Sequence, residues 1–314
     1  MGFDLEALGA ALREHGRVCR VVIAAIRGSS PREVGAAMLV WDQGQSGTIG
    51  GGALEFEAAE AARKQDQKTH LSTHALGPDL GQCCGGSVTL VSEIYHMEDF
   101  AQLDSEVILR PVTPQAAASP PLAATRQLAQ LRAQGQNPEP QLIDHWMLEP
   151  VHRPQRDLWI WGAGHVGRAL VDVLAPLPDL AITWVDTAPT RFPAHIPAGV
   201  NMLPGQDPTL LLRHAPANAQ HLVLTYSHEL DLALCHGLLL HGFSFAGLIG
   251  SATKWARFRS RLAALGHRPA EIARITCPIG VPALGKHPQM IAVGVATELL
   301  ALAARKEMEE ERRA

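Results

Sequence analysis

A glycine-rich turn that directly follows an apolar strand constrains the fold of this chain more than any other feature. Leu158-Trp159-Ile160-Trp161 is expected to form a buried strand, and residues 162–167, Gly-Ala-Gly-His-Val-Gly, match the pattern G-x-G-x-x-G. The match is informative because it lies between a strand and a helix, where such a turn can hold a phosphate at the helix N-terminus. Gly162 would permit the bend, Gly164 would let a ligand approach the backbone, and Gly167 would let helix and strand pack closely.

Strands and helices alternate in the rest of this half of the chain. Further strands are expected at 182–186, 221–225 and 245–249, and helices at 166–174, 230–241, 253–265 and 290–305. This alternation predicts a parallel sheet with helices on both faces, so we interpret residues 157–314 as a Rossmann-type α/β domain. Asp186 ends the second strand, 22 residues after Gly164, where a dinucleotide-binding enzyme contacts a ribose. The alternative is a domain of this fold that no longer binds a nucleotide.

Polar residues after the strand at 221–225 are the candidates for catalysis in such a domain. Tyr226, His228 and Asp231 follow its carboxyl end, where parallel sheets hold their ligands. Ser227 could equally be a simple helix cap. The chain shows neither a Tyr-x-x-x-Lys pair nor paired carboxylates placed for acid–base work. These residues keep an NAD(P)-dependent oxidoreductase as an alternative, but they define no catalytic constellation, and we expect no enzyme.

The first part of the chain is expected to form a smaller α+β domain over residues 1–97. Helices are expected at 3–15 and 53–64, and strands at 18–26, 36–41 and 88–95. Residues 98–156 are rich in Pro, Ala and Gln and contain one helical stretch at about 123–134. We interpret this segment as a connector between the two domains.

Two polar loops of the first domain could bind an anion. Gly50, Gly51 and Gly52 directly precede a helix, so their N–H groups could face a phosphate, although a hairpin loop without a ligand is the alternative. The loop at 27–32 ends in Arg32, whose guanidinium suits a phosphate. A solvated surface arginine would have the same sequence pattern.

A third loop contains two adjacent cysteines, Cys83 and Cys84, between glycines. A thiolate there could ligate a soft metal centre or carry a sulfur atom, whereas buried, inert cysteines are the alternative. Cys19, Cys235 and Cys277 lie in apolar surroundings and are expected in the core. The chain has no C-x-x-C pair, which argues against a disulfide framework or a structural zinc site.

Composition narrows the class of protein. The net charge is −4, which argues against a nucleic-acid-binding protein because such proteins usually carry a basic stripe. No apolar run approaches the roughly 20 residues that cross a bilayer, so we expect no membrane segment. The acidic start, Met1-Gly2-Phe3-Asp4-Leu5-Glu6, does not look like a signal peptide, and we expect a cytoplasmic location.

Several of these segments together resemble the XdhC/CoxI family. In the first domain, Gly28-Ser29-Ser30-Pro31-Arg32, Gly47-Thr48-Ile49-Gly50-Gly51-Gly52 and Gly81-Gln82-Cys83-Cys84-Gly85-Gly86 match the family pattern. In the second, the Gly162–Gly167 turn, Ser227-His228…Asp231, Gly247-Leu248-Ile249-Gly250-Ser251…Lys254 and Pro278-Ile279-Gly280 do so. The combination covers most of the chain outside 98–157 and is more specific than any single motif.

The resemblance implies an accessory protein of molybdenum hydroxylases. It implies that the chain binds the molybdenum cofactor, a pterin with a dithiolene-bound molybdenum and a terminal phosphate. The cofactor would be held while a cysteine desulfurase supplies its sulfido ligand, and then delivered to the xanthine dehydrogenase apo-enzyme. A homodimer is plausible for such a protein. Candidate cofactor-binding residues are Arg32, Gly50, Gly51, Gly52, Cys83, Cys84, Gly162, Gly164, Gly167, Asp186 and His228, with Cys83 or Cys84 as the molybdenum contact. The turn that ends at Lys254 is a third candidate site for the phosphate.

Overall fold

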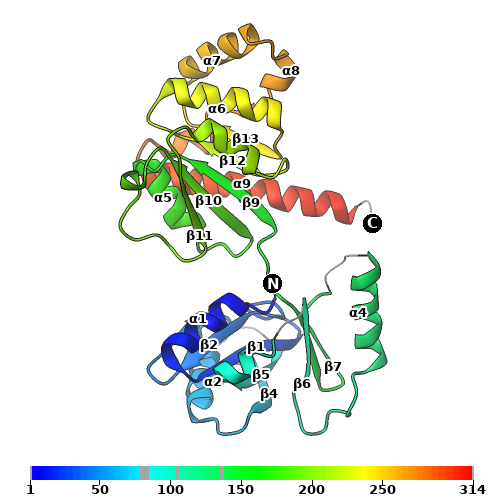
Figure 1. The fold of residues 1–314 in the computed structure, drawn as a ribbon. Helices are drawn as coiled ribbons and strands as arrows, with labels where there is room; N and C mark the ends of the chain where they lie inside the picture. The colour runs from blue at the N-terminus through cyan, green and yellow to red at the C-terminus, as the bar shows by residue number, and fades with distance from the viewer. Residues whose placement is uncertain (1, 78–84, 104–105, 135–137, 313–314) are drawn as a thin grey trace. The chain divides into compact units, whose positions relative to one another are not determined.

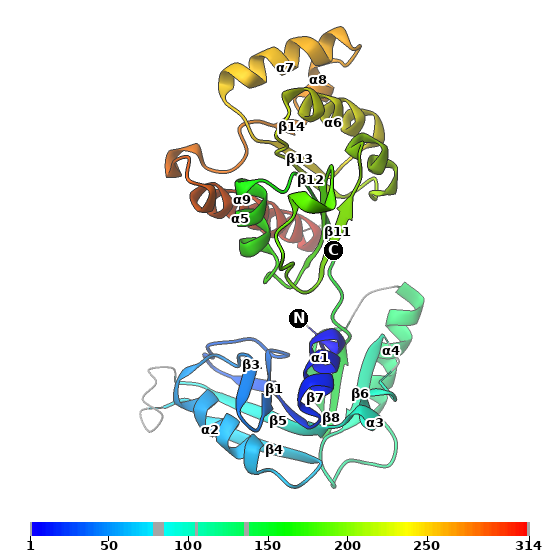
Figure 2. The ribbon, with the colours of Figure 1, turned by 60° about the vertical axis from the view of Figure 1, so that its left-hand side comes forward.

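The computed structural model describes residues 2–77, 85–103, 106–134 and 138–312. The chain divides into two compact units, Met1–Arg153 and Pro154–Ala314, and each is described by itself. Figures 1 and 2 show the elements of both units from two directions. An antiparallel sheet organises the first unit and a six-stranded parallel sheet organises the second, so the predicted α/β class is confirmed.

The first unit contains a five-stranded antiparallel sheet in the order β3-β2-β1-β5-β4. The strands are β1 (Val18–Arg27), β2 (Ala37–Trp41), β3 (Gly44–Gly47), β4 (Thr69–Ala75) and β5 (Ser87–Tyr95). Helix α2 (Gly52–Lys64) covers one face, where its Leu54 and Ala58 pack with Val21 of β1. Helix α1 (Leu5–His15) packs its Leu8 beside Val18 at the other end of the same strand.

Residues expected to form a connector belong to the first unit instead. They form a second antiparallel sheet in the order β6-β8-β7, together with two helices. The elements are α3 (Met97–Phe100), β6 (Val107–Pro111), α4 (Leu122–Gln134), β7 (Gln141–Ile143) and β8 (Trp146–Pro150). Met147 of β8 packs with Val22 of β1, so this small sheet covers the face opposite α2. The prolines misled the interpretation because Pro111 and Pro150 end strands, a position that tolerates proline.

A buried network of charges joins the two sheets of the first unit. Arg20 of β1 donates two hydrogen bonds to the Glu149 carboxylate of β8, at 2.7 and 3.0 Å, and both side chains are almost fully buried. Arg110 of β6 contacts both Glu149 and Glu93 of β5. Removing one member would leave an uncompensated buried charge, which typically costs about 3–5 kcal/mol. The small sheet is therefore fixed to the large one by specific pairing as well as by apolar contact.

The second unit is a parallel sheet in the order β11-β10-β9-β12-β13-β14. Its strands are β9 (Arg156–Trp161), β10 (Leu180–Asp186), β11 (Val200–Pro204), β12 (Gln220–Val223), β13 (Phe245–Leu248) and β14 (Ile275–Thr276). The strand order reverses between β9 and β12, and the glycine turn lies beside the carboxyl end of β12. This is the crevice in which such sheets hold ligands.

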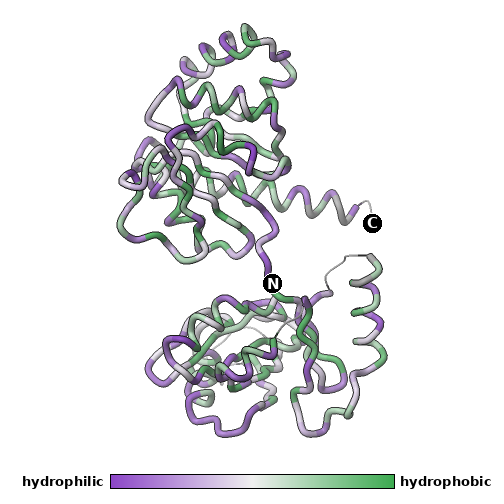
Figure 3. Tube along the Cα trace, in the orientation of Figure 1, coloured by the Kyte–Doolittle hydropathy of each residue, from purple (hydrophilic) through white to green (hydrophobic). Residues whose placement is uncertain are grey.

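Helices cover both faces of this sheet, as predicted. Helices α5 (His165–Leu174) and α9 (Pro288–Glu311) pack on one face, and α6 (His228–His241) and α7 (Ala252–Ala264) on the other. Shorter elements are η2 (Pro189–Arg191), η3 (Pro208–His214), α8 (Pro269–Ile272) and η4 (Pro282–Leu284). The hydropathy colouring in Figure 3 shows hydrophobic segments concentrated in the sheets and a hydrophilic end of α9. None of the helices in the described ranges is long and apolar enough to span a membrane.

Candidate functional site

Two glycines of the turn between β9 and α5 are required by the fold itself. Gly162 has a φ of +124°, and a Cβ there would lie 2.5 Å from the Leu224 carbonyl oxygen at the end of β12. A Cβ on Gly167 would overlap the carbonyl oxygen of Gly162, because α5 packs directly against the end of β9. These two glycines therefore explain the close approach of strand, turn and helix, as the motif predicts.

Gly164 differs from the other two glycines because the fold does not require it. It is the N-cap of α5 with a φ of −74°, a conformation open to any residue. Among the described residues apart from its chain neighbours, none would have an atom within 4 Å of a Cβ there, and none caps the helix with its side chain. The described residues therefore supply no side-chain acceptor to the first N–H groups of α5, which carry the positive end of the helix dipole. The turn offers a phosphate both room and hydrogen-bond donors.

Asp186 anchors this turn from the end of β10. Its Oδ2 accepts a hydrogen bond from the Ala163 N–H at 2.6 Å, and its Oδ1 accepts from the N–H and hydroxyl of Thr187. The carboxylate is 4% exposed and lies 3.4 Å from the Arg191 guanidinium. A ribose would have to share a carboxylate that already has three donors. Ribose binding by Asp186 therefore stays a prediction, while the hydrogen bond by which Asp186 fixes the turn is observed.

A second group of polar residues lies at the same carboxyl edge of the sheet. Asp231 is fully buried, and its carboxylate accepts hydrogen bonds from the N–H and the hydroxyl of Thr225. The ammonium of Lys254 contacts this carboxylate at 2.6 Å and also donates to the Ile249 carbonyl. Gly162 lies against Thr225, so the glycine turn and this network are neighbours. The structure thus joins two residues, Asp231 and Lys254, that the sequence motifs present separately.

The other predicted residues of this edge make fewer contacts. His228 begins α6 and is exposed, with its ring centroid 6.5 Å from that of Phe258, and it makes no hydrogen bond within the described ranges. Tyr226 is 67% exposed and lies under the Arg191 guanidinium, 4.7 Å from the ring centroid. Ser227 caps α6 by accepting a hydrogen bond from Leu230, as the simpler interpretation predicts. Contact between His228 and a cofactor remains a prediction.

In the first unit, the topology gathers the polar loops at one edge of the large sheet. A Cβ on Gly50 would lie 2.6 Å from the Cγ of Pro31, so the loops at 27–32 and 47–52 touch. A Cβ on Gly28 would lie 3.1 Å from the Cα of Gly86, which ends the third loop. Antiparallel pairing explains this arrangement, since the end of β1 lies opposite the start of β5. Cys83 and Cys84 themselves lie outside the described residues.

A carboxylate of the chain itself occupies the glycine turn before α2. The Oε2 of Glu55 accepts hydrogen bonds from the Ile49 N–H, the Gly51 N–H and the Thr48 hydroxyl. Partial burial opposes the charge on Glu55, but these hydrogen bonds outweigh it and lower the pKa of the carboxyl group below its ordinary value. The predicted phosphate contact at Gly50, Gly51 and Gly52 is untested, and a phosphate there would first have to displace Glu55.

Arg32 likewise has a partner within the chain. Its guanidinium donates to both carboxylate oxygens of the adjacent Glu33, at 3.1 and 3.2 Å. This pair is partly exposed, so the attraction is screened and the guanidinium could exchange its partner. Cofactor binding by Arg32 stays a prediction.

The described cysteines partly follow the expectation of a core position. Cys19 and Cys235 are buried, and burial raises the pKa of the Cys19 thiol to about 12. Cys277 is only half-buried, because it follows the short β14 at the edge of the sheet. Burial, the first cause, still raises the pKa of its thiol to about 11. Within the described ranges, no group of three or more His, Cys, Asp or Glu side chains is placed to hold a metal ion.

Comparison with known proteins identifies both parts of the chain. A model of the XdhC Rossmann domain matches residues 158–299, and a model of the XdhC and CoxI family matches residues 11–74. The uncharacterized protein YqeB of Escherichia coli (strain K12) is 22% identical over 281 residues, which are 87% of this chain but 41% of that protein. The chain therefore spans less than half the length of this curated relative.

A solved structure shows the same fold. A Bacillus halodurans protein described as a xanthine dehydrogenase is 20% identical, with 96% of each chain covered and a TM-score of 0.70. The two matched segments hold the glycine turn of the second unit and two of the three polar loops of the first. They agree with the resemblance drawn from the motifs, and the chain belongs to the XdhC/CoxI family.

Proposed function

We propose that this protein is a carrier of the molybdenum cofactor in the maturation of xanthine dehydrogenase, and not an enzyme. Membership of the XdhC/CoxI family supports a maturation role. The observation that carries the proposal is Gly164, a glycine that neither backbone conformation nor packing requires, at an open helix N-terminus. A ligand that approaches the backbone closely would account for it.

The cofactor phosphate suits the first turn of α5. The N–H groups after Gly164 would donate to its oxygens, while Asp186 keeps Ala163 and hence the turn in place. Lys254 is neutralised by Asp231, so it would orient the neighbouring loop rather than bind the anion. Asp186 and Lys254 would thus hold the shape of the site rather than react with the cofactor, which is what a carrier requires.

The cysteine loop is proposed to act at the molybdenum end of the cofactor. Cys83 or Cys84 would offer a thiolate to the metal while a cysteine desulfurase supplies the sulfido ligand. Delivery to the apo-enzyme would follow, and the carrier would act as a homodimer. Gly86, which follows this loop, lies beside Gly28 of the loop that ends in Arg32.

A loading experiment tests the proposal. The protein is purified from a host that makes the cofactor, its molybdenum is measured by mass spectrometry, and its pterin by fluorescence after oxidation. Gly164→Ala, Cys83→Ala and Cys84→Ala should each lower the content of cofactor. The control is Asp172→Ala, a change at an exposed residue two turns along α5, which should retain the wild-type content. A wild-type protein that neither retains nor can be loaded with the pterin would contradict the proposal.

The same turn could bind a nicotinamide nucleotide, which is the alternative function. Asp186 at the end of β10 is the observation that favours it. Calorimetric titration with NAD and NADP separates the two functions, since the glycine turn of a carrier should bind neither dinucleotide at millimolar concentration. Saturable binding of either nucleotide together with failure to load the pterin would favour the oxidoreductase.

A further inference from the structure

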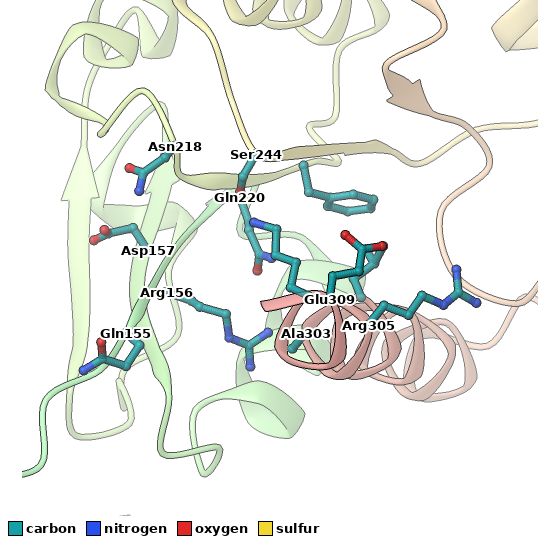
Figure 4. A pocket seen from close by; sticks show the side chains of 12 residues that line it. Gln155, Arg156, Asp157, Asn218, Gln220, Ser244, Ala303, Arg305 and Glu309 are labelled. Atoms are coloured by element: carbon teal, nitrogen blue, oxygen red, sulfur yellow. The ribbon is translucent and has the colours of Figure 1, made fainter. Parts of the chain in front are cut away.

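A cavity lies at the opposite, amino edge of the parallel sheet. It has a volume of about 320 Å³ and is bounded by the starts of β9, β12 and β13 and by the last turns of α9. Small-molecule sites usually measure about 300–1,000 Å³, so this one suits a ligand of mononucleotide size. Figure 4 shows Arg156, Gln220 and Ala303 around this space. All of its lining residues belong to the second unit.

Gln220 is an unexpected residue in this wall. It begins β12 beside Leu158 of β9, and the alternation of the strand turns it, like Leu222, toward the face that α5 and α9 cover. Its side chain is more than nine-tenths buried, and its Oε1 accepts no hydrogen bond within the described part of the chain. An apolar side chain would fit this face at less cost. A donor supplied by a bound molecule would account for the amide.

The rim of the cavity supplies charge. Arg156, Arg305 and Lys306 line it together with two carboxylates, Asp157 and Glu309, which leaves an excess of one positive charge. The Arg156 guanidinium donates to the Leu299 carbonyl at 3.3 Å, which fixes it beside the cavity. Within the described ranges, no salt bridge joins any of these five side chains to another. Guanidinium and ammonium groups in such a setting suit a phosphate.

We propose that this cavity binds a phosphorylated nitrogen heterocycle, a purine mononucleotide or a pterin phosphate. Gln220 accepts a hydrogen bond from an N–H group of the heterocycle, and Arg156 with Lys306 binds the phosphate. The apolar part of the lining, Phe245 and Ala303, contacts the flat ring. This site is distinct from the glycine turn, since amino and carboxyl ends of parallel strands lie at opposite edges of a sheet. It adds a second ligand to the protein and does not depend on where the molybdenum cofactor binds.

Calorimetric titration of the full-length protein tests this site. AMP, GMP and neopterin phosphate are the probes, and adenosine, guanosine and neopterin are the controls that lack the phosphate. We expect saturable binding of at least one phosphorylated probe and affinity at least tenfold weaker for its unphosphorylated counterpart. Whichever probe binds identifies the source of the heterocycle. No heat from any probe at millimolar concentration would overturn the proposal and leave water as the occupant.

Two variants connect binding to the residues. Gln220→Met removes the amide at nearly constant volume, and we expect it to weaken binding about tenfold without lowering the melting temperature. Lys306→Ala lies on the exposed rim and should weaken only the phosphorylated probes. Gly164→Ala, at the opposite edge, should leave the titrations with AMP and GMP unchanged even where cofactor loading is lost. Equal affinity in Gln220→Met and wild type would overturn the assignment, and Lys306→Ala serves the same purpose if Gln220→Met does not fold.

Discussion

Replacing Gly164 with alanine separates what the fold requires from what a ligand requires. The backbone there has φ −74° and ψ −173°, which alanine adopts without strain. In the part of the chain that the structure describes, no residue beyond the two chain neighbours has an atom within 4 Å of the added Cβ. At such positions Gly→Ala raises stability by about 0.4–1 kcal/mol, because the unfolded chain loses conformational freedom. The free energy of unfolding of Gly164→Ala should therefore equal or slightly exceed that of the wild type.

Ligand affinity should change in the opposite direction. The methyl group would stand in the space through which a phosphate reaches the first N–H groups of α5. Losing one hydrogen bond to a charged group costs about 1.5–3 kcal/mol. At 1.4 kcal/mol for each factor of ten, the cofactor should bind roughly ten- to a hundredfold more weakly.

The neighbouring glycines provide the comparison. Gly162→Ala would put a side chain on a residue with φ +124° and 2.5 Å from the Leu224 oxygen, and Gly167→Ala would overlap the Gly162 oxygen. Each should lower the free energy of unfolding by about 1–3 kcal/mol, measured by urea denaturation. The reasoning is refuted if Gly164→Ala loses stability like these two, or if it is stable and retains the cofactor as well as the wild type.

Three further perturbations test the electrostatics of the two units. Lys254→Met leaves the buried Asp231 carboxylate without its cation and should lower the free energy of unfolding in urea by about 3–5 kcal/mol. A second change, Asp231→Asn, should recover part of this loss, and no recovery would contradict the pairing of the two charges. Hydrogen bonds from Thr48 and two N–H groups outweigh partial burial and hold the pKa of Glu55 below 4.5, so its contribution is present above that pH and is lost as the pH falls through the lowered pKa. Glu55→Gln should therefore show a smaller drop in stability between pH 7 and pH 3 than the wild type, and an equal drop would contradict this role. Burial lowers the pKa of His221 from 6.5 to about 3, so between these two pH values only the unfolded chain binds the proton. The melting temperature should therefore fall as the pH is lowered from 6.5 to 3, and it should fall less steeply in a His221→Gln variant.

The second unit could be predicted closely because its signals are local. The four central strands of the sheet, β9, β10, β12 and β13, contain short apolar runs. Helices α5, α6 and α7 each begin within a few residues of the strand before them, and the glycine turn marks the first crossover. The two strands that were not predicted, β11 and β14, lie at the edges of the sheet. Edge strands are half-exposed or very short, and their apolar pattern is correspondingly weak.

The first unit was harder to predict because its decisive contacts are distant in sequence. Arg20 and Glu149 are 129 residues apart, and neither residue reveals its partner until the fold brings them together. The segment at 98–156 looked like a connector because its proline content suppresses the pattern of regular structure. Its buried apolar residues, such as Met147, stand in short runs that are separated by polar and proline-rich stretches. The missed signal was a short apolar run at the start of each of two strands, residues 107–109 of β6 and residues 146–148 of β8.

Two glycine turns that look alike in sequence differ in structure because of one residue in the helix that follows. Glu55 is the fourth helical residue after its N-cap, Gly51, and its carboxylate turns back onto the N–H groups that an external anion would use. Arg168 holds the equivalent position in α5, after Gly164, and it donates to the Ala163 and Arg191 carbonyls instead. The glycine turn before α2 is therefore closed by the chain's own carboxylate, whereas no side chain of the described residues caps α5, which has a positive charge beside its N-terminus. A glycine turn before a helix is a candidate phosphate site only when the first residues of that helix hold no acid, and by that criterion the turn at Gly164 is the better candidate for the proposed ligand.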